Sequence, residues 1–354
     1  MLLAIESSCD ETAIAIFDLK KILSGVAITD SILAEEIASS AKFHEAYGGI
    51  VPELAAREQT LTLPPLFDRA LKKACIDVTQ LTAIAVTAGP GLNGSLLVGL
   101  SFAKGLSYAL KIPLIPINHL EGHLSAHLLL PTKLKKPFVS LLVSGGHTEN
   151  ILETSSGRKV LAKTRDDAAG EAFDKCASLL GLPYPGGPEL SKLAEKGNRE
   201  RFKFPVALPE DLASFSFSGL KTAVLRAVKD LGELSAEDKS DLAASTESAI
   251  SRALISKTIR LALDNKATGV FLTGGVAANR YLRQELSKNC SSNGLEFAVA
   301  DMRYCTDNAT MIAAAAIDKI MQNTSHFSNW EPKEGSELGP DASFSIHTKT
   351  SWSV

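Results

Sequence analysis

The sequence predicts a duplicated α/β fold, in which two similar halves each consist of a sheet with helices and a cleft separates the halves. Two repeated patterns predict this fold class. An apolar strand, a short polar turn and a second apolar stretch occur at 2–17 and again at 138–152. A buried strand, a glycine-rich turn and a helix occur at 83–110 and again from 269 onward. Because both patterns recur in the same order, the halves are expected to share one architecture.

Length and composition are those of a soluble globular protein with two domains. The chain has 354 residues, 45% of them hydrophobic and 22% charged. A net charge of −3 excludes a strongly basic nucleic-acid binder, so any contact with nucleic acid is expected to be local or shared with a partner. Five scattered cysteines, no signal peptide and no apolar run long enough to span a membrane together predict a cytoplasmic protein.

The elements of the first half are predicted in order along the chain. The turn at 7–12 contains Asp10 and Glu11 and lacks an Asn-Gly or Asp-Gly pair, which indicates that its acids and amides have a use. An ordinary β-hairpin is the alternative. Helices are expected at about 31–42 and from 52 to about 73. The turn at 89–95 lies between a strand and a helix, where free amides suit an anion.

The second half is longer than the first, and its extra residues fall at about 165–222. We therefore predict an N-terminal subdomain at 1–135 and a C-terminal subdomain at 136–317 that carries this insertion. The segment at about 318–334 is expected to pack back on the first subdomain. Residues 335–354 are rich in Ser, Thr and Gly and are expected to form a polar surface tail.

A duplicated α/β unit with phosphate-handling turns in both halves resembles the actin, hexokinase and Hsp70 class of folds. In that class the ligand binds in the cleft between the halves. The resemblance concerns the fold and does not give the reaction. A sugar or acetate kinase of this class is therefore one candidate function.

Two of the seven histidines, His119 and His123, are four residues apart between an apolar strand and an apolar helix. This spacing puts both imidazoles on one helix face, where they can bind one metal ion. Asp307 precedes another helix, where it is either a cap or a third ligand, and two histidines with one carboxylate suit catalytic iron or zinc. Glu121 lies two residues from each histidine instead of beside the first, which disfavours a zinc protease.

Ten motifs in one order identify a family. The chain from 3 to about 332 resembles the TsaD family, the tRNA N6-adenosine threonylcarbamoyltransferases. The matching stretches are residues 5–12, 47–53, 89–91, 119–123, 142–148, 166–175, 185–188, 215–222, 274–279 and 305–308. Departures are small: Ser7, Ala4 and Gln59 stand where the family usually has Thr, Gly and His.

The resemblance implies a role for each matching residue. His119, His123 and Asp307 match the family's ligands for one divalent ion per subunit, Fe²⁺ or Zn²⁺. Asp10 and Glu11 match acidic residues near the reaction centre. The positions implied to hold the adenylate substrate are Leu142, Val143, Ser144, Gly145, Gly146, Asp174, Gly187 and Asn279.

The reaction implied by the resemblance is attack by N6 of adenosine 37 of tRNA on threonylcarbamoyl-AMP, with release of AMP. The product, t6A, forms in tRNAs that read codons beginning with A, and the target base lies in the single-stranded anticodon loop. Partners implied in bacteria are a TsaB-like paralogue of the same fold and a TsaE-like ATPase, with no membrane involved. A non-catalytic scaffold is a third candidate, but it should lack the metal-ligand set. For the basic cluster Arg199, Arg201 and Lys203, a solvated face is favoured over contact with RNA.

Overall fold

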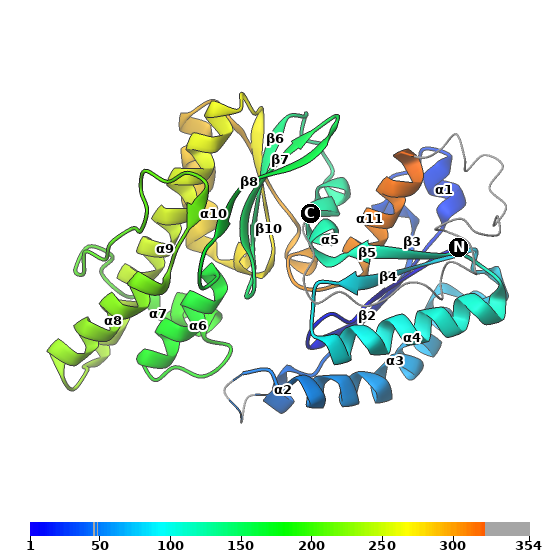
Figure 1. The fold of residues 1–354 in the computed structure, drawn as a ribbon, viewed down its shortest axis with the longest axis horizontal. Coiled ribbons are helices and arrows are strands. Elements are labelled where there is room, and N and C mark those ends of the chain that lie inside the picture. Colours follow the sequence, from blue (N-terminus) through cyan, green and yellow to red (C-terminus); the bar gives the residue numbers. More distant parts are fainter. Residues whose placement is uncertain (45–46, 48, 323–354) are drawn as a thin grey trace. The chain divides into compact units, whose positions relative to one another are not determined.

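A computed structural model of the chain describes residues 1–44, 47 and 49–322, and it divides into two compact units (Figure 1). Unit 1 contains residues 1–131 together with the chain from 307 onward, and unit 2 contains residues 132–306. The predicted tail at 335–354, and most of the segment at 318–334, lie outside the described residues. No helix in the described part of the chain is both long and apolar enough to span a membrane.

Unit 1 is built on a five-stranded sheet in the order β3-β2-β1-β4-β5. The first three strands in the chain pair antiparallel, whereas β4 and β5 run parallel to β1. The strands are β1 (Leu2–Glu6), β2 (Glu11–Phe17), β3 (Ile32–Ser39), β4 (Ala83–Gly89) and β5 (Leu114–Asn118). The helices are α1 (Leu19–Leu23), α2 (Ala41–His44), α3 (Pro52–Ala74), α4 (Asn93–Leu110), α5 (His119–Ser125) and α11 (Ala309–Gln322), with short 3₁₀ turns η1 (Thr29–Ser31), η3 (Val78–Gln80) and η4 (Ala126–Leu129).

The side chains of β1 point alternately to the two faces of the sheet in unit 1, and helices cover both faces. Leu3 and Ile5 pack on one face of the sheet in a cluster that includes Leu63 of α3 and Leu100 of α4. The intervening residues of β1 pack on the other face with the alanine-rich side of α11. Figure 1 shows α3 and α4 on one side of this sheet and α11 on the other. Both faces of β1 are therefore buried, which explains why its sequence is continuously apolar up to Glu6.

Unit 2 repeats this plan on a six-stranded sheet in the order β11-β10-β6-β7-β8-β9. Strands β6, β7 and β8 form an antiparallel meander, and β10 and β11 run parallel to β6. The strands are β6 (Phe138–Val143), β7 (Thr148–Thr154), β8 (Gly157–Thr164), β9 (Ser214–Phe215), β10 (Gly269–Thr273) and β11 (Glu296–Val299). The helices are α6 (Ala169–Leu179), α7 (Gly186–Ala194), α8 (Ser218–Leu231), α9 (Ala236–Asp264) and α10 (Arg280–Ser292), with 3₁₀ turns η5 (Gly275–Ala278) and η6 (Met302–Tyr304).

The matching strand orders confirm the predicted duplication. The meander β1-β2-β3 corresponds to β6-β7-β8, and the parallel pair β4-β5 corresponds to β10-β11. The residues expected to form the extra part of unit 2 contain α6, α7 and β9. The duplicated α/β class predicted from the sequence is therefore the fold of this chain.

One expectation about the elements is wrong. The helix expected at 31–42 is instead β3, paired along its length with β2. The apolar residues at 33, 34, 37 and 38 have helical spacing. The segment nevertheless forms a strand, because it pairs with the edge of β2 that no other strand covers. The helix α11 belongs to unit 1, because its apolar face completes the core of that unit.

Candidate metal centre and ligand pocket

The histidine pair lies on α5, directly after β5. Asn118, the last residue of β5, accepts hydrogen bonds from the amides of Leu120 and Glu121 at 2.8 and 3.4 Å. This side chain caps the helix, which begins at His119, so that His123 follows one turn later. Both imidazoles are buried and lie edge to face, with 4.8 Å between ring centroids.

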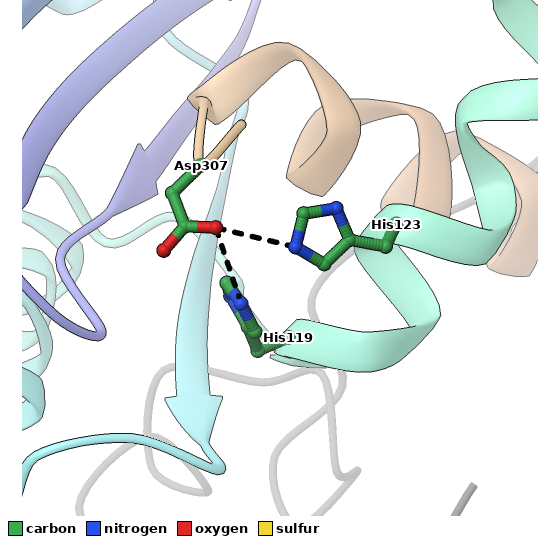
Figure 2. Close-up of side chains that lie close together, drawn as sticks. All are labelled: His119, His123 and Asp307. Atoms are coloured by element: carbon green, nitrogen blue, oxygen red, sulfur yellow. Dashed lines mark ion pairs between the residues drawn. The ribbon is translucent and has the colours of Figure 1, made fainter. Parts of the chain in front are cut away.

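Asp307 lies two residues before the first residue of α11, and its carboxylate is directed toward both histidines (Figure 2). Its Oδ1 is 3.4 Å from Nε2 of His119 and 3.2 Å from Nε2 of His123. The capping role that Asp307 could have had is taken by Asn308, whose Oδ1 accepts the amide hydrogen of Met311 at 2.8 Å. The Asp307 carboxylate is therefore directed to the histidines.

Gly122 allows α5 and α11 to approach closely. A Cβ atom at this position would lie 2.8 Å from Cδ1 of Ile312 and 3.2 Å from Cγ of Met311. A larger residue would force the side chains of Ile312 and Met311 to shift, so the glycine between the two histidines lets α5 pack closely against the start of α11. All of these residues belong to unit 1.

The orientation of His119 is fixed from behind by β1 and the turn that follows it. Oε2 of Glu6 and Oγ of Ser8 each lie 3.1 Å from Nδ1 of His119, which leaves Nε2 facing Asp307. Burial disfavours the charged imidazole, but the carboxylates of Asp307 and Glu6 outweigh burial and raise the pKa of His119 to about 9. A carboxylate behind a metal-binding histidine is a common arrangement, because it fixes the tautomer and the ring.

Of the predicted acidic pair, Asp10 ends the turn between β1 and β2 and Glu11 begins β2, and both act on the same site as Asp307. Burial, together with the charges of Asp307 and Asp10, raises the pKa of Glu11 to about 10. The turn is held by Gln59 of α3, whose Nε2 donates to the carbonyl oxygens of Cys9 and Glu11 at 2.9 and 3.0 Å. The glutamine that departs from the family pattern thus supports the backbone of this turn.

The donor set fits a divalent cation. His119, His123 and Asp307 each offer one ligand atom, and these atoms lie within 4.8 Å of one another. Two imidazole nitrogens and one carboxylate oxygen suit zinc or iron with positions left for substrate or water. Repulsion between the carboxyl groups of Asp307, Asp10 and Glu11 contributes to the raised pKa of Glu11, and a bound cation would relieve that repulsion. The structure therefore contains a candidate metal centre, built wholly within unit 1.

A cavity of about 420 Å³ in unit 2 contains several of the residues implied to hold the adenylate. Gly145, Asp174, Gly187 and Asn279 line it together, although they come from four separate segments of the chain. Oδ1 of Asp174 accepts the amide hydrogen of Gly187 at 2.9 Å, and burial raises the pKa of Asp174 above its ordinary value. A cavity of this size can accommodate a nucleotide-sized ligand.

The other implied positions shape the turn beside this cavity without lining it. Leu142 and Val143 are buried within β6, so they can offer a ligand only backbone atoms. Ser144 closes the turn, because its Oγ accepts the amide hydrogen of His147 at 3.1 Å, and Gly146 is exposed. Gly274 has φ +91°, and a Cβ there would lie 2.4 Å from the carbonyl oxygen of Val143, so glycine lets the two turns pack together.

Sequence reasoning missed two residues of these sites. Glu6, which orients His119, is fully buried. An acidic residue at the end of a continuously apolar strand is unusual, and this feature of the sequence could have indicated its role. Ser191 lines the cavity on α7, one helical turn after Gly187, and that spacing could have indicated it.

The remaining charged candidates form ion pairs within their own units. Glu121 pairs with Lys319 of α11 at 2.9 Å, in keeping with the argument against a zinc protease. Arg199 pairs with Glu247 at 2.9 Å, and Arg201 pairs with Asp238 and Asp241 at 2.6 and 2.9 Å. The two arginines of the basic cluster are thus held by α9, which favours a structural role over contact with RNA.

Comparison with solved structures confirms the fold. Full-length HypF in a phosphate- and nucleotide-bound form matches with a TM-score of 0.59 at 15% identity, covering 92% of this chain and 56% of that chain. An activator of 2-hydroxyisocaproyl-CoA dehydratase from Clostridium difficile matches with a TM-score of 0.51 at 13% identity, covering 93% and 99%. The chain therefore has the actin/hexokinase-like fold, here with a candidate metal centre in one unit and a ligand cavity in the other.

Comparison of sequences then gives the family. A family model described as TsaD, tRNA N6-adenosine threonylcarbamoyltransferase, matches residues 31–314. A protein of that name from Caldicellulosiruptor saccharolyticus is 49% identical over 94% of this chain and 97% of its own length. Another, from Thermosipho melanesiensis, is 48% identical over 92% and 96%. This chain belongs to the TsaD family.

Proposed function

We propose that this protein transfers the threonylcarbamoyl group from threonylcarbamoyl-AMP to N6 of adenosine 37 in tRNA, forming t6A. The observation that carries the proposal is that His119, His123 and Asp307 come together in a chain of the TsaD family. A small-molecule kinase of the same fold has no use for this group, and a non-catalytic scaffold would not need it.

Unit 2 would bind the adenylate part of the donor. Asp174 supplies a half-buried carboxylate that can accept hydrogen bonds from ribose hydroxyls. Gly145 and Gly146 are exposed and Gly275 is half-buried, so their backbone amides can donate to a phosphate, whereas the amide of Ser144 already donates to the carbonyl oxygen of His147 at 2.8 Å. Because the mixed anhydride is already activated, the protein mainly has to position it and stabilise the charge that develops.

Unit 1 would supply the metal and the acid–base groups. His119, His123 and Asp307 would hold one Fe²⁺ or Zn²⁺ ion, which when bound can act as a Lewis acid toward a substrate oxygen. In the transfer step, N6 of the adenosine forms a bond to the carbamoyl carbon while the bond from that carbon to the phosphate oxygen breaks. AMP leaves with the electron pair, and the N6 proton passes to the carboxylate of Asp10, or to that of Glu11 where a bound cation lowers its raised pKa and keeps it ionised.

The proposed partners follow from the substrate and the charge of the chain. The target base lies in an anticodon loop, where a single-stranded base can be turned out into a pocket. With a net charge of −3, the chain is expected to share tRNA binding with a TsaB-like paralogue, and a TsaE-like ATPase is the other expected partner. All of these components belong in the cytoplasm.

The test is reconstitution with purified protein, its TsaB-like and TsaE-like partners, tRNA transcript and threonylcarbamoyl-AMP, with t6A measured by mass spectrometry of digested tRNA. We expect t6A from the wild type and at least a hundredfold less from His119→Ala, because removal of a metal ligand costs metal affinity and activity. A reaction with ATP and small-molecule acceptors such as sugars or acetate, assayed for ADP and phosphorylated product, tests the kinase alternative.

The proposal fails if the wild type makes no t6A under these conditions, or if His119→Ala is fully active. His127→Ala is the matched control, because His127 is also buried and lies one turn from His123 without joining the metal group. Loss of activity in both variants would indicate a general effect on folding and would remove the support for the metal.

A further inference from the structure

Asn279 in the cavity wall is held by an unusually complete set of hydrogen bonds. Its Nδ2 donates to Oγ of Ser191 at 2.7 Å and to Oε1 of Glu247 at 2.8 Å. Its Oδ1 accepts the amide hydrogen of Leu282 at 2.7 Å, which caps α10. These bonds join α7, α9 and α10 at one side chain.

The partners determine which way the Asn279 amide faces. A carboxylate can only accept, so Glu247 requires the NH₂ group on its side, and the Leu282 amide can only donate, so it requires the oxygen. A primary amide has two hydrogens and two oxygen lone pairs. Both hydrogens and one lone pair are used, so Asn279 can offer a ligand only the remaining lone pair of Oδ1.

Ser191 is complementary to Asn279. Its Oγ accepts from Nδ2 of Asn279, and its hydroxyl hydrogen makes no bond to any described residue. Ser191 also lines the cavity, so this hydrogen is available to a ligand. The pair thus offers one acceptor and one donor, side by side.

Glu247 is the residue that fixes this polarity. It lies on α9 with a side chain only 2% exposed, and it does not line the 420 Å³ cavity. Its second oxygen, Oε2, accepts from Nη2 of Arg199 at 2.9 Å, and the Arg199 guanidinium lies 4.3 Å from the centre of the Tyr281 ring. The buried charge is therefore compensated, and each carboxylate oxygen has its own donor.

We propose that Glu247 is a positioning residue for the cavity in unit 2: through Asn279 it fixes an acceptor–donor pair that selects a ligand with a hydrogen-bond donor at that point. This inference rests on the proposed function for the identity of the ligand, an adenylate. In an adenylate the donor is the 2′-hydroxyl, the 3′-hydroxyl or the 6-amino group.

The test uses Glu247→Gln in the full-length protein. The Nδ2 group of Asn279 and the guanidinium of Arg199 each donate to one oxygen of Glu247, but a glutamine has only one side-chain oxygen. In Glu247→Gln, one of these two donors therefore faces the NH₂ group of the glutamine and loses its hydrogen bond. Adding Arg199→Met removes the competing donor and allows the glutamine oxygen to return to Asn279. Glu153→Gln is the matched control, because Glu153 is also a buried glutamate of unit 2, paired with Arg158 at 3.0 Å on β7 and β8.

Binding is measured by calorimetry with AMP, 2′-deoxy-AMP, 3′-deoxy-AMP and inosine monophosphate, and folding is monitored by thermal denaturation. We expect Glu247→Gln to bind AMP about tenfold more weakly and to lose most of its discrimination against one of the three analogues. The double variant should recover both affinity and discrimination, and Glu153→Gln should match the wild type. The analogue whose discrimination changes identifies the donor that meets Asn279.

The inference is overturned if the wild type binds AMP and Glu247→Gln keeps both its affinity and its discrimination. It is also overturned if Glu153→Gln loses affinity equally, or if the double variant recovers nothing, because a loss of fold would then explain the effect. Failure of the wild type to bind any of the four nucleotides would instead contradict the proposed function, and the inference would fall with it.

Discussion

At the scale of single residues, the candidate metal centre depends on the orientation of the three side chains that supply its ligand atoms, His119, His123 and Asp307. His119 is fixed by Glu6 and Ser8 on one ring nitrogen, so its other nitrogen meets Asp307 without rearrangement. Such a preformed set costs little conformational entropy on binding an ion. The centre should therefore bind a divalent ion in the isolated protein, before any substrate is present.

We expect His119→Ala, His123→Ala and Asp307→Ala each to lose most of the bound Zn²⁺ or Fe²⁺, measured by elemental analysis of protein purified after metal loading. Glu6→Gln should weaken metal affinity by about tenfold, because it alters the group that orients His119. His127→Ala should keep its metal. Retention of a full complement of metal by any of the three ligand variants would contradict this assignment.

The cysteines differ in reactivity because of their burial. Cys75 is exposed at the end of α3, whereas burial raises the pKa of the Cys176 and Cys290 thiols to about 12 and that of Cys305 to about 11. Burial and the charge of Asp307 also raise the pKa of Cys9. Since the thiolate is the reactive form, iodoacetamide at pH 8 should modify Cys75 in the native protein and the other four only after unfolding. Peptide mass spectrometry measures this, and rapid native labelling of Cys176 would show the burial to be wrong.

At the scale of elements, the contact between α5 and α11 determines where Asp307 lies relative to the histidines. We expect Gly122→Ala to destabilise the protein by about 1–3 kcal/mol, because its Cβ would overlap Ile312. The same displacement should lower metal content. Urea unfolding measures the free energy of unfolding, and elemental analysis measures the metal content.

Gly105→Ala on α4 is the control for this substitution. A Cβ at Gly105 would have no neighbour within 4 Å, so the change should stabilise the helix by about 0.5–1 kcal/mol. If Gly122→Ala resembles Gly105→Ala in both stability and metal content, close packing of α5 on α11 does not position Asp307.

A second element, the start of α8, is held by Asp166, which lies in the loop between β8 and α6. Asp166 accepts from Oγ of Ser216 at 2.5 Å, from the amide of Phe217 at 2.8 Å and from Oγ of Ser218 at 2.8 Å. Burial opposes ionisation of Asp166, but these hydrogen bonds outweigh burial and hold its pKa below the ordinary value of 3.8. A lowered pKa means that the stabilisation is present above the unfolded-state pKa and is lost as the pH falls through the folded-state pKa.

We therefore expect Asp166→Asn to cost about 1 kcal/mol at pH 7, with the difference from wild type shrinking below about pH 4. Urea unfolding at pH 7 and pH 3 measures both values. Asp230→Asn on the exposed side of α8 is the control and should change little at either pH. An unchanged difference at pH 3 would show that ionised Asp166 is not what holds the helix.

At the scale of the whole molecule, the elements that could be predicted from the sequence are those set by a local pattern of apolar residues. Buried strands such as Phe138–Val143 and Gly269–Thr273 were predicted within a residue, because runs with both faces covered are continuously apolar. The helix predicted at 31–42 was wrong, because strand pairing with β2 overrode helical spacing. The contacts of Asn279 with Ser191 and Glu247 could not be predicted, since they join helices that only the tertiary fold brings together.

The net charge of the chain leads to a last prediction, which concerns the salt dependence of tRNA binding. Binding to RNA releases counterions, so the logarithm of the affinity falls with the logarithm of the salt concentration, with a slope set by the number of phosphates contacted. A chain with a net charge of −3, whose Arg199 and Arg201 are committed to acidic residues of α9, should contact few phosphates alone. We expect weak tRNA binding with a shallow slope for the isolated protein, and tighter binding with a steeper slope when the TsaB-like partner is added. Fluorescence anisotropy of labelled tRNA from about 50 to 300 mM salt measures both slopes; strong, equally steep binding without the partner would show that this chain carries the RNA surface by itself.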